Sequence, residues 1–142
     1  MDVGICSDSK QVLMIGLPSS VKIFLFSEPV DMRNGHDGLS GMVTRNGQDV
    51  FSGHLFVFYS KRRDRIKILT WDTGGYILFY KRLEAGCFKL SRVSKEQKTI
   101  SLDAAELSML LDGIDFSRVR RSKKWRPPQK NATVLKPVAD HV

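Results

Sequence analysis

The hydrophobic positions of this chain are concentrated in short runs, and three of these runs follow one another between Phe51 and Lys89. Each run is rich in aromatic and β-branched residues, while Gly, Asp, Ser and Thr cluster in the polar turns between them. This arrangement is typical of consecutive antiparallel strands joined by short turns. The pattern therefore predicts a three-strand meander over residues 55–59, 65–71 and 76–83.

Two further apolar runs extend the predicted sheet. The segment VKIFLFS at residues 21–27 is predicted as a strand before the meander, and residues 88–93 are predicted as a strand after it. The predicted fold class is therefore α+β, with an antiparallel sheet of four or five strands, a shorter helix after the first strand and a long C-terminal helix.

The clearest helical pattern covers residues 102–114, LDAAELSMLLDGI. Asp103 stands at an N-cap position, and Glu106 three residues later completes a capping box. Apolar residues recur at helical spacing from Leu107 to Ile114, and Gly113 can end the helix. This helix is the long C-terminal helix of the predicted fold, and the segment LDGIDFSRVRRSKKWRP directly continues it.

The shorter helix is predicted over residues 31–44, DMRNGHDGLSGMVT. Asp31 is the expected N-cap, and the apolar side is formed by Met32, Leu39, Met42 and Val43. The glycines in this segment oppose the assignment, because each costs up to about 1 kcal/mol in a helix interior.

The predicted strands do not alternate cleanly between apolar and polar residues. A sheet with one face in water shows polar residues at every second position, whereas residues 76–80 are all apolar or aromatic. Two explanations remain open. Either helices cover both faces of the sheet, or one face is a partner surface, with a homodimer or a larger complex as the assembly.

The positive charge of the chain is confined to one segment. The formal net charge is +8, but residues 1–116 hold 15 Lys and Arg against 14 Asp and Glu. Residues 117–130 hold seven basic residues and no acidic one. We therefore divide the 142 residues into a loose N-terminal extension (1–13), a single α+β domain (14–116), a basic arm (117–130) and a mobile tail (131–142). Charge confined to an arm predicts contact with a polyanion.

The rest of the composition points to an ordinary cytoplasmic protein. No apolar run approaches the roughly 20 residues needed to cross a bilayer, and the N-terminus lacks the basic and apolar regions of a secretory signal. Cys6 and Cys87 are far apart in the sequence, so no disulfide is expected, and Cys87 is interpreted as a small buried thiol.

No residue pattern predicts catalysis. Two-metal phosphodiester chemistry needs converging carboxylates, whereas Asp31 is expected to be a cap, Asp64 lies in a basic turn and Asp72 precedes a Gly-rich turn. His36 and His54 lack partners at metal-ligand spacing, and neither a P-loop nor a dinucleotide fingerprint is present. We expect no enzyme activity, no metal and no cofactor.

Four sequence blocks resemble one protein family. They are LPSSVKIFL, VDMRNGHDGL, the block that runs from FSGHLFVF through KILTWD to LFYKRLEAGCF, and LDGIDFSRVRRSKKWRP. In order and spacing, the chain from residue 14 to residue 127 is similar to the TnpB-type accessory proteins of the IS-sixty-six class of bacterial insertion sequences. The resemblance implies an accessory function in transposition beside a separate large transposase. The partners that it implies are that transposase and the other products of the same element.

Nucleic-acid binding is the function that the charge pattern favours. Lys and Arg of the arm would contact DNA phosphates with low sequence specificity, and the turn over residues 61–65 is either a second basic contact or a solvated hairpin loop, the loop being favoured. Trp125 either stacks on a base or packs back onto the body, and packing is favoured. The alternative function is a protein-interaction module that binds the transposase without contacting DNA. The candidate DNA-binding residues are Arg118, Arg120, Arg121, Lys123, Lys124, Trp125, Arg126, Lys61, Arg62, Arg63 and Arg65.

Overall fold

The computed structural model describes residues 17–90, 93–94, 96–115 and 127–128. Its described elements are five strands, two α-helices and one short 3-10 helix. In chain order they are β1 (Ile23–Phe26), α2 (His36–Arg45), η1 (Val50–Ser52), β2 (Leu55–Tyr59), β3 (Arg65–Asp72), β4 (Gly75–Arg82), β5 (Thr99–Leu102) and α3 (Ala104–Leu111). The α+β class and the meander of β2, β3 and β4 are confirmed.

The five strands form one sheet in the order β4-β3-β2-β1-β5. Strands β2, β3 and β4 are antiparallel neighbours, and β5 is antiparallel to β1. Strand β1, however, runs parallel to β2, with Ile23 opposite Leu55. The prediction of a wholly antiparallel sheet is wrong at this pair. Helix α2 carries the chain back across the sheet, so β2 starts at the same end as β1 and the two strands become parallel.

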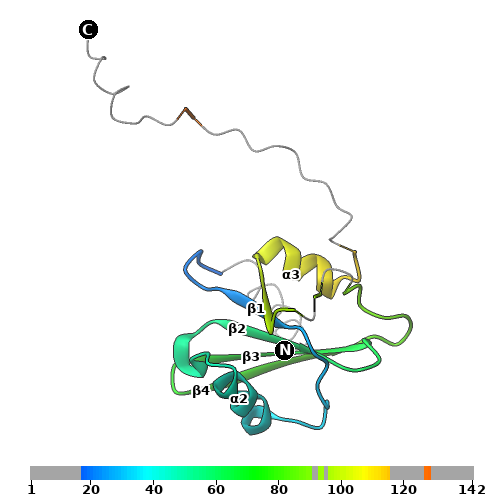
Figure 1. Ribbon diagram of the computed structural model, residues 1–142, viewed down its shortest axis with the longest axis horizontal. Helices are drawn as coiled ribbons and strands as arrows, with labels where there is room; N and C mark the ends of the chain where they lie inside the picture. Colours follow the sequence, from blue (N-terminus) through cyan, green and yellow to red (C-terminus); the bar gives the residue numbers. More distant parts are fainter. Residues whose placement is uncertain (1–16, 91–92, 95, 116–126, 129–142) are drawn as a thin grey trace, which may run out of the picture.

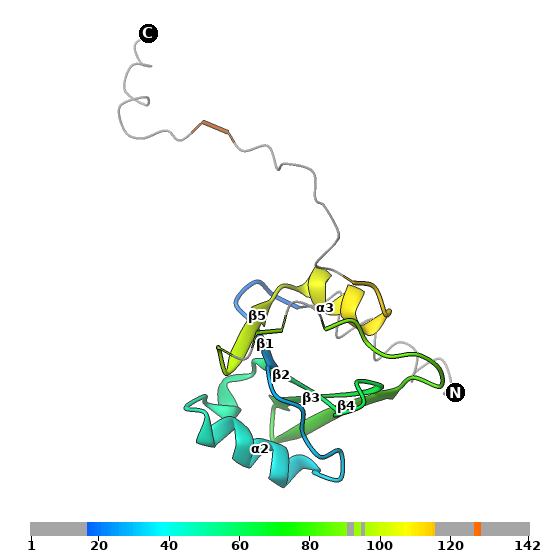
Figure 2. The ribbon, with the colours of Figure 1, turned by 45° about the vertical axis from the view of Figure 1, so that its right-hand side comes forward.

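Helices α2 and α3 cover opposite faces of the sheet (Figure 1), and the rotated view in Figure 2 shows the same arrangement. Each central strand therefore supplies apolar side chains to two separate cores. In β2, Leu55 and Val57 belong to the core under α3, whereas Phe56 and Phe58 belong to the core under α2. The absence of polar alternation thus has a physical cause: helices cover both faces, as one of the two sequence interpretations proposed.

The fifth strand is not where the sequence predicted it. Residues 88–90, the described start of the predicted strand 88–93, form no strand, although Phe88 and Leu90 are buried in the core under α3. The fifth strand is β5, which is only four residues long and lies directly before α3. Ser27 holds its beginning, since the Ser27 backbone N–H donates to the Lys98 carbonyl at 3.0 Å.

Helix α3 begins as predicted, because Asp103 and Glu106 form a reciprocal capping box. It ends in a Schellman motif, in which the Ile114 N–H donates to the Met109 carbonyl at 2.9 Å and Gly113 is left-handed with φ 79°. The helix has eight residues, so the predicted long C-terminal helix is not confirmed. Residues 112–115, which were predicted to be in this helix or to continue it, are described and are not helical. The N-terminal extension, the mobile tail and all of the basic arm except Pro127 and Pro128 lie outside the described residues.

Helix α2 confirms the predicted shorter helix but starts five residues later than the sequence suggested. Its N-cap is Gly35 rather than Asp31. Asp31 instead closes a turn ahead of the helix, where its carboxylate accepts from the Arg33 backbone N–H at 2.9 Å. Strand β3 fixes this connector between β1 and α2: the buried Lys67 ammonium donates to the carbonyls of Met32 and Asn34, each at 2.8 Å.

Candidate nucleic-acid interface

The turn between β2 and β3 is a tightly ordered backbone carrying exposed cations. The Arg63 N–H donates to the Ser60 carbonyl at 2.8 Å, and Arg63 itself is left-handed with φ 63°. The single acidic residue of the turn, Asp64, accepts a hydrogen bond from the Ser60 hydroxyl at 3.1 Å. A neighbouring segment supports the turn, because the Phe88 N–H donates to the Arg63 carbonyl at 2.6 Å.

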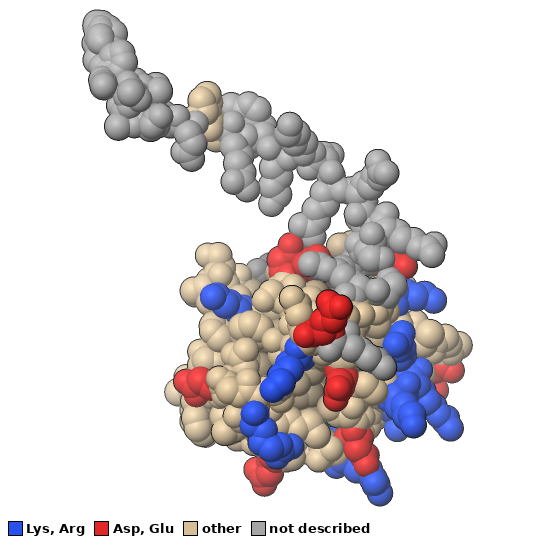
Figure 3. All heavy atoms as spheres, viewed as in Figure 1, with Lys and Arg blue, Asp and Glu red and all other residues tan. Residues whose placement is uncertain are grey.

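Three cations of this turn are left available. The side chains of Lys61, Arg62 and Arg63 are exposed and make no ion pair or hydrogen bond with any residue that the structure describes. Figure 3 shows Lys and Arg side chains gathered on the side of the molecule where this turn lies. We name Lys61, Arg62 and Arg63 the hairpin cations. A rigid backbone with three available positive side chains is a suitable surface for phosphate groups.

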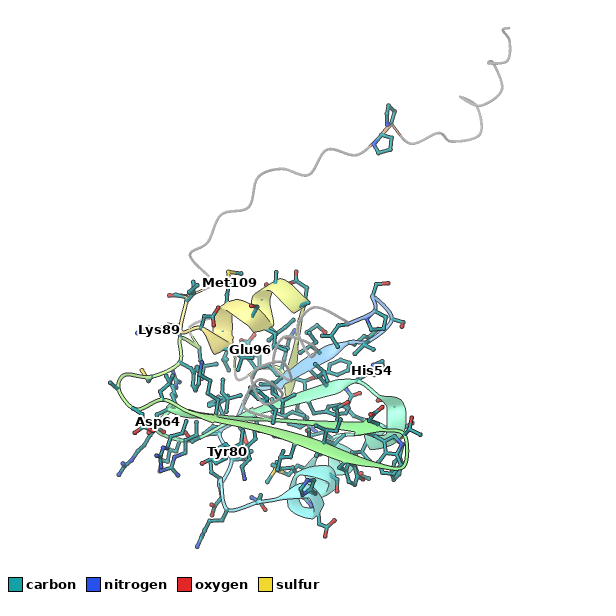
Figure 4. The ribbon with its side chains drawn as sticks, turned by 180° about the vertical axis from the view of Figure 1, so that it is seen from behind. His54, Asp64, Tyr80, Lys89, Glu96 and Met109 are labelled. Atoms are coloured by element: carbon teal, nitrogen blue, oxygen red, sulfur yellow. The ribbon has the colours of Figure 1, made fainter. Side chains whose placement is uncertain are left out.

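A cleft of about 720 Å³ separates this turn from the connector between β1 and α2. Its apolar wall includes Val30 and Met32, and its polar wall includes Lys61, Arg62 and Arg65. Because Lys67 holds the connector by two backbone carbonyls, the cleft is bounded on both sides by ordered chain. The turn lies at one end of the sheet, and Figure 4 shows Asp64 there, well away from His54.

Two carboxylates line the cleft, and both have partners. Asp31 pairs with Arg33 through an Nη2–Oδ2 contact of 2.6 Å, and this hydrogen-bonded guanidinium lowers the Asp31 pKa from 3.8 to about 2. Asp64 accepts from Ser60 as described above. Neither carboxylate forms an ion pair with a hairpin cation, so the positive charge of the turn is not cancelled within the part of the chain that the structure describes.

Arg65 is the least satisfied cation of the cleft. Its Nε–H is buried and has no hydrogen-bond partner among the described residues. Arg65 also lies directly opposite Arg82 across the β3–β4 pair, so two guanidinium groups share one face of the sheet. Arg82 has a carboxylate partner, Glu84, at 3.0 Å. Like charges in directly opposite positions of neighbouring strands are destabilising.

Tyr59 supports the base of this turn. Its phenol donates to the Ser27 carbonyl at 2.5 Å, and the Tyr59 carbonyl accepts from the Val30 N–H at 2.9 Å. Burial raises the Tyr59 pKa, and the positive charge of Arg63 opposes this effect. The hydrogen bonds tie the end of β2 to the connector, so both walls of the cleft share one support.

The predicted turn residues therefore come together with two cations that sequence reasoning missed, Arg33 and Arg82. Arg82 could have been found from the sequence. Pairing the predicted strands 65–71 and 76–83 through a short turn places Arg82 near Arg65. No feature of the sequence placed Arg33 near this turn, because its segment was predicted to be helical. The remaining candidates, which lie outside the described residues, are Arg118, Arg120, Arg121, Lys123, Lys124, Trp125 and Arg126.

Other candidate residues have structural roles. Within the described residues, no group of three or more His, Cys, Asp or Glu side chains is placed to hold a metal ion. The His54 Nδ1 accepts from the Lys22 backbone N–H at 3.1 Å. The interpretation of Cys87 as a buried thiol is wrong: left-handed Gly86, with φ 78°, turns the chain so that Phe88 is buried and Cys87 is exposed.

Neither α-helix of the described chain is long and apolar enough to cross a membrane. The cytoplasmic location stays a prediction.

Comparison with known proteins identifies the class to which this chain belongs. The family model described as IS66 Orf2 like protein matches residues 21–121, which include every described strand and both helices. The chain belongs to this IS66 TnpB-type family, as its sequence blocks indicated. Membership indicates an accessory protein encoded by an insertion sequence.

Two relatives from Sinorhizobium fredii (strain NBRC 101917 / NGR234) match over almost their whole length. The protein named "Uncharacterized protein y4jC" is 36% identical over 115 residues, covering 80% of this chain and 97% of its own length. The protein named "Uncharacterized protein y4hO" is 35% identical over 118 residues, covering 78% of this chain and 96% of its own. No solved structure gives a significant match.

Proposed function

We propose that this protein is a non-catalytic accessory protein of insertion-sequence transposition that associates with DNA and acts with a separate large transposase. The observation that carries the DNA association is the set of hairpin cations, which are exposed and have no partner among the described residues. Family membership supports the connection with transposition. The basic arm supplies further cations to the same DNA.

The proposed contact is with the phosphate backbone. Arg and Lys on a short turn reach phosphate oxygens and position the protein, whereas reading a sequence requires side chains that enter a groove and meet base edges. None of the described elements carries a DNA-reading motif such as a helix-turn-helix. Binding is therefore expected to be salt-dependent and largely independent of sequence.

The test is a mobility-shift titration of the purified chain on duplex DNA at several salt concentrations. Replacing Lys61, Arg62 and Arg63 together with Gln is expected to weaken binding on every sequence alike. Because each phosphate contact contributes a slope of about 0.9, the slope of log affinity against log salt should decrease by about 2–3.

The matched control replaces three exposed cations elsewhere, Lys22, Arg45 and Lys98, with Gln. This variant carries the same net charge as the hairpin variant. If both triple variants lose affinity equally, the binding depends on net charge and not on the hairpin. If the wild-type chain does not retard DNA at low salt, the DNA association is refuted.

One surface favours the alternative of a protein-interaction module. At the opposite end of β3, the ring of Phe51 packs edge-on against Trp71 at 4.9 Å, and Trp71 packs against Tyr76 at 5.0 Å. Phe51 is 59% exposed despite these contacts. Exposed aromatic side chains are frequent anchors of protein interfaces. In a pull-down against the transposase, binding that needs Phe51 and no DNA would support this second function.

A further inference from the structure

Strand β4 ends the sheet and leaves a long apolar edge. No described strand pairs with its outer side, and its eight residues read GYILFYKR. Ile77 and Tyr80, which point to opposite faces of this strand, are 48% and 49% exposed. Natural edge strands are usually short, interrupted by Pro or charged along their length. The other edge strand, β5, is short with four residues, whereas β4 has charges only at its final two positions.

The hydrogen-bonding pattern shows which backbone groups of β4 have no partner strand among the described residues. The Leu83 N–H donates to the Asp64 carbonyl, and Asp72 pairs with Gly75 across a two-residue turn. In an antiparallel pair, the residues that exchange hydrogen bonds alternate along the strand. Odd-numbered residues of β4 therefore face β3. The backbone N–H and C=O groups that point outward, away from every described strand, belong to Tyr76, Leu78, Tyr80 and Arg82.

We propose that two copies of this chain pair through β4, antiparallel and centred on Phe79, to form one continuous sheet across a two-fold axis. A two-fold axis perpendicular to the sheet keeps each side chain on its own face, so a residue can lie opposite only a residue of the same face. Centring the pair on Phe79 satisfies this condition. It also places the outward-pointing backbone groups of one β4 strand opposite those of the other.

The charges of β4 favour a second copy of the chain as the strand that pairs with this edge, and they favour the antiparallel direction. Antiparallel pairing places Lys81 opposite the partner's Ile77 and Arg82 opposite the partner's Tyr76. The two basic ends of the strands then lie far apart, and Arg82 contacts an aromatic ring, which is a favourable cation–π arrangement. A parallel pair would instead place the four cations side by side. The edge is thus complementary to an inverted copy of itself.

The arrangement has a consequence that rests on the proposed function. Both copies present the face that carries Arg65 and Arg82 on the same side of the extended sheet. The two sets of hairpin cations lie at opposite ends of the paired strands, about ten residues or roughly 35 Å apart along the strand direction. This distance is comparable with one turn of B-DNA, about 34–36 Å. One duplex can therefore contact both hairpins.

The test measures the oligomeric state of the full chain by sedimentation equilibrium without DNA, so its outcome is independent of DNA binding. The wild-type chain is expected to have twice the monomer mass of 16.1 kDa. Ile77→Lys places a charge beside the partner's Lys81, and Tyr80→Pro removes an outward-pointing N–H. Each variant is expected to be a folded monomer by circular dichroism. Ile114→Lys, at a 44% exposed apolar position outside β4, should remain a dimer.

Amide hydrogen exchange provides a measurement that needs no variant. The amides of Tyr76, Leu78, Tyr80 and Arg82 should be protected at high protein concentration and exchange faster on dilution. Concentration-independent exchange at these four amides overturns the proposal. So does a monomeric wild-type chain, or a dimer that persists in both Ile77→Lys and Tyr80→Pro.

Discussion

Arg65 and Arg82 lie directly opposite each other on strands β3 and β4, and of the two only Arg82 has a carboxylate partner, Glu84, among the described residues. The strand pairing places two arginines opposite each other, and the Nε–H of Arg65 is buried without a hydrogen-bond partner among the described residues. Such an arrangement costs stability in the free protein. We interpret it as a site prepared for an external anion, which the proposed DNA contact would supply.

This interpretation predicts opposite effects on binding and on stability. Arg65→Met removes the charge and the unsatisfied N–H but keeps an unbranched apolar stem against the sheet. DNA affinity should decrease, whereas the free energy of unfolding should stay constant or increase by a few tenths of a kcal/mol. Urea unfolding and a DNA titration measure the two effects. A destabilised Arg65→Met variant would show that Arg65 has a structural role.

The basic arm gives a second DNA prediction. Replacing Arg120, Arg121, Lys123 and Lys124 together with Gln should weaken duplex binding on all sequences. If about four phosphate contacts are lost, the slope of log affinity against log salt should decrease by roughly 3–4. Unchanged affinity and slope would favour the protein-interaction alternative. A loss confined to the ends of the element would mean that the arm reads bases.

Lys67 is predicted to stabilise the connector between β1 and α2, which forms one wall of the cleft. Lys67→Met would leave the carbonyls of Met32 and Asn34 without the buried ammonium that now bonds both. Loss of charged hydrogen bonds in a buried site should cost about 2–3 kcal/mol in the free energy of unfolding. The exposed Lys22→Met is the control and should change stability by less than about 0.5 kcal/mol. Equal stability of the two variants would contradict the anchoring role.

Leu110 tests the core beneath α3. This side chain is fully buried, so Leu110→Ala should cost roughly 2–5 kcal/mol through lost burial and a cavity. Met109 on the same helix is only partly buried, and Met109→Ala should cost less. Urea unfolding of both variants is the measurement. A cost below about 0.5 kcal/mol for Leu110→Ala would show that α3 does not pack on the sheet.

The ion pair of Asp31 and Arg33 predicts a pH dependence at acidic pH. The folded-state pKa of Asp31, about 2, is below its ordinary value of 3.8 because Arg33 bonds the charged form. The stabilising contribution is therefore present above pH 3.8 and is lost as the pH falls through about 2. Carboxyl NMR titration should show the low pKa in the wild-type chain and a higher pKa in Arg33→Gln, which keeps only the bond from the backbone N–H. An unshifted Asp31 in the wild-type chain would refute the pair.

Local patterns predicted most of the fold because local physics decides it. The apolar runs of β2, β3 and β4 and the turns between them were visible in the sequence, as was the capping box of α3. The parallel pairing of β1 with β2 was missed, although a helix between two strands is its usual sign. Strand β5 was missed because four residues beside a helix cap give too short an alternation to identify.

The candidate site was predictable only in part, for the same reason. The hairpin cations are consecutive in the sequence and were found as a group, whereas Arg33 joins them through the path of a connector that Lys67 fixes. A hydrogen bond between residues far apart in the sequence leaves no periodic pattern from which it could be predicted. The exposure of Cys87 beside the buried Phe88 likewise follows a left-handed glycine, Gly86, whose conformation is not visible in the sequence.

Arg65 and Lys67 are two positions apart in β3, so their side chains lie on the same face of the sheet. Arg65 lines the cleft, and Lys67 anchors the connector that forms one of its walls. Mutational tolerance should therefore differ sharply within a few residues. The tip of the turn can gain or lose residues while both side chains keep their face. A slip of one residue in the register of β3 would instead move both to the α3 side at once. In the evolution of this family, length variation should accumulate at the tip and be rejected within the strand.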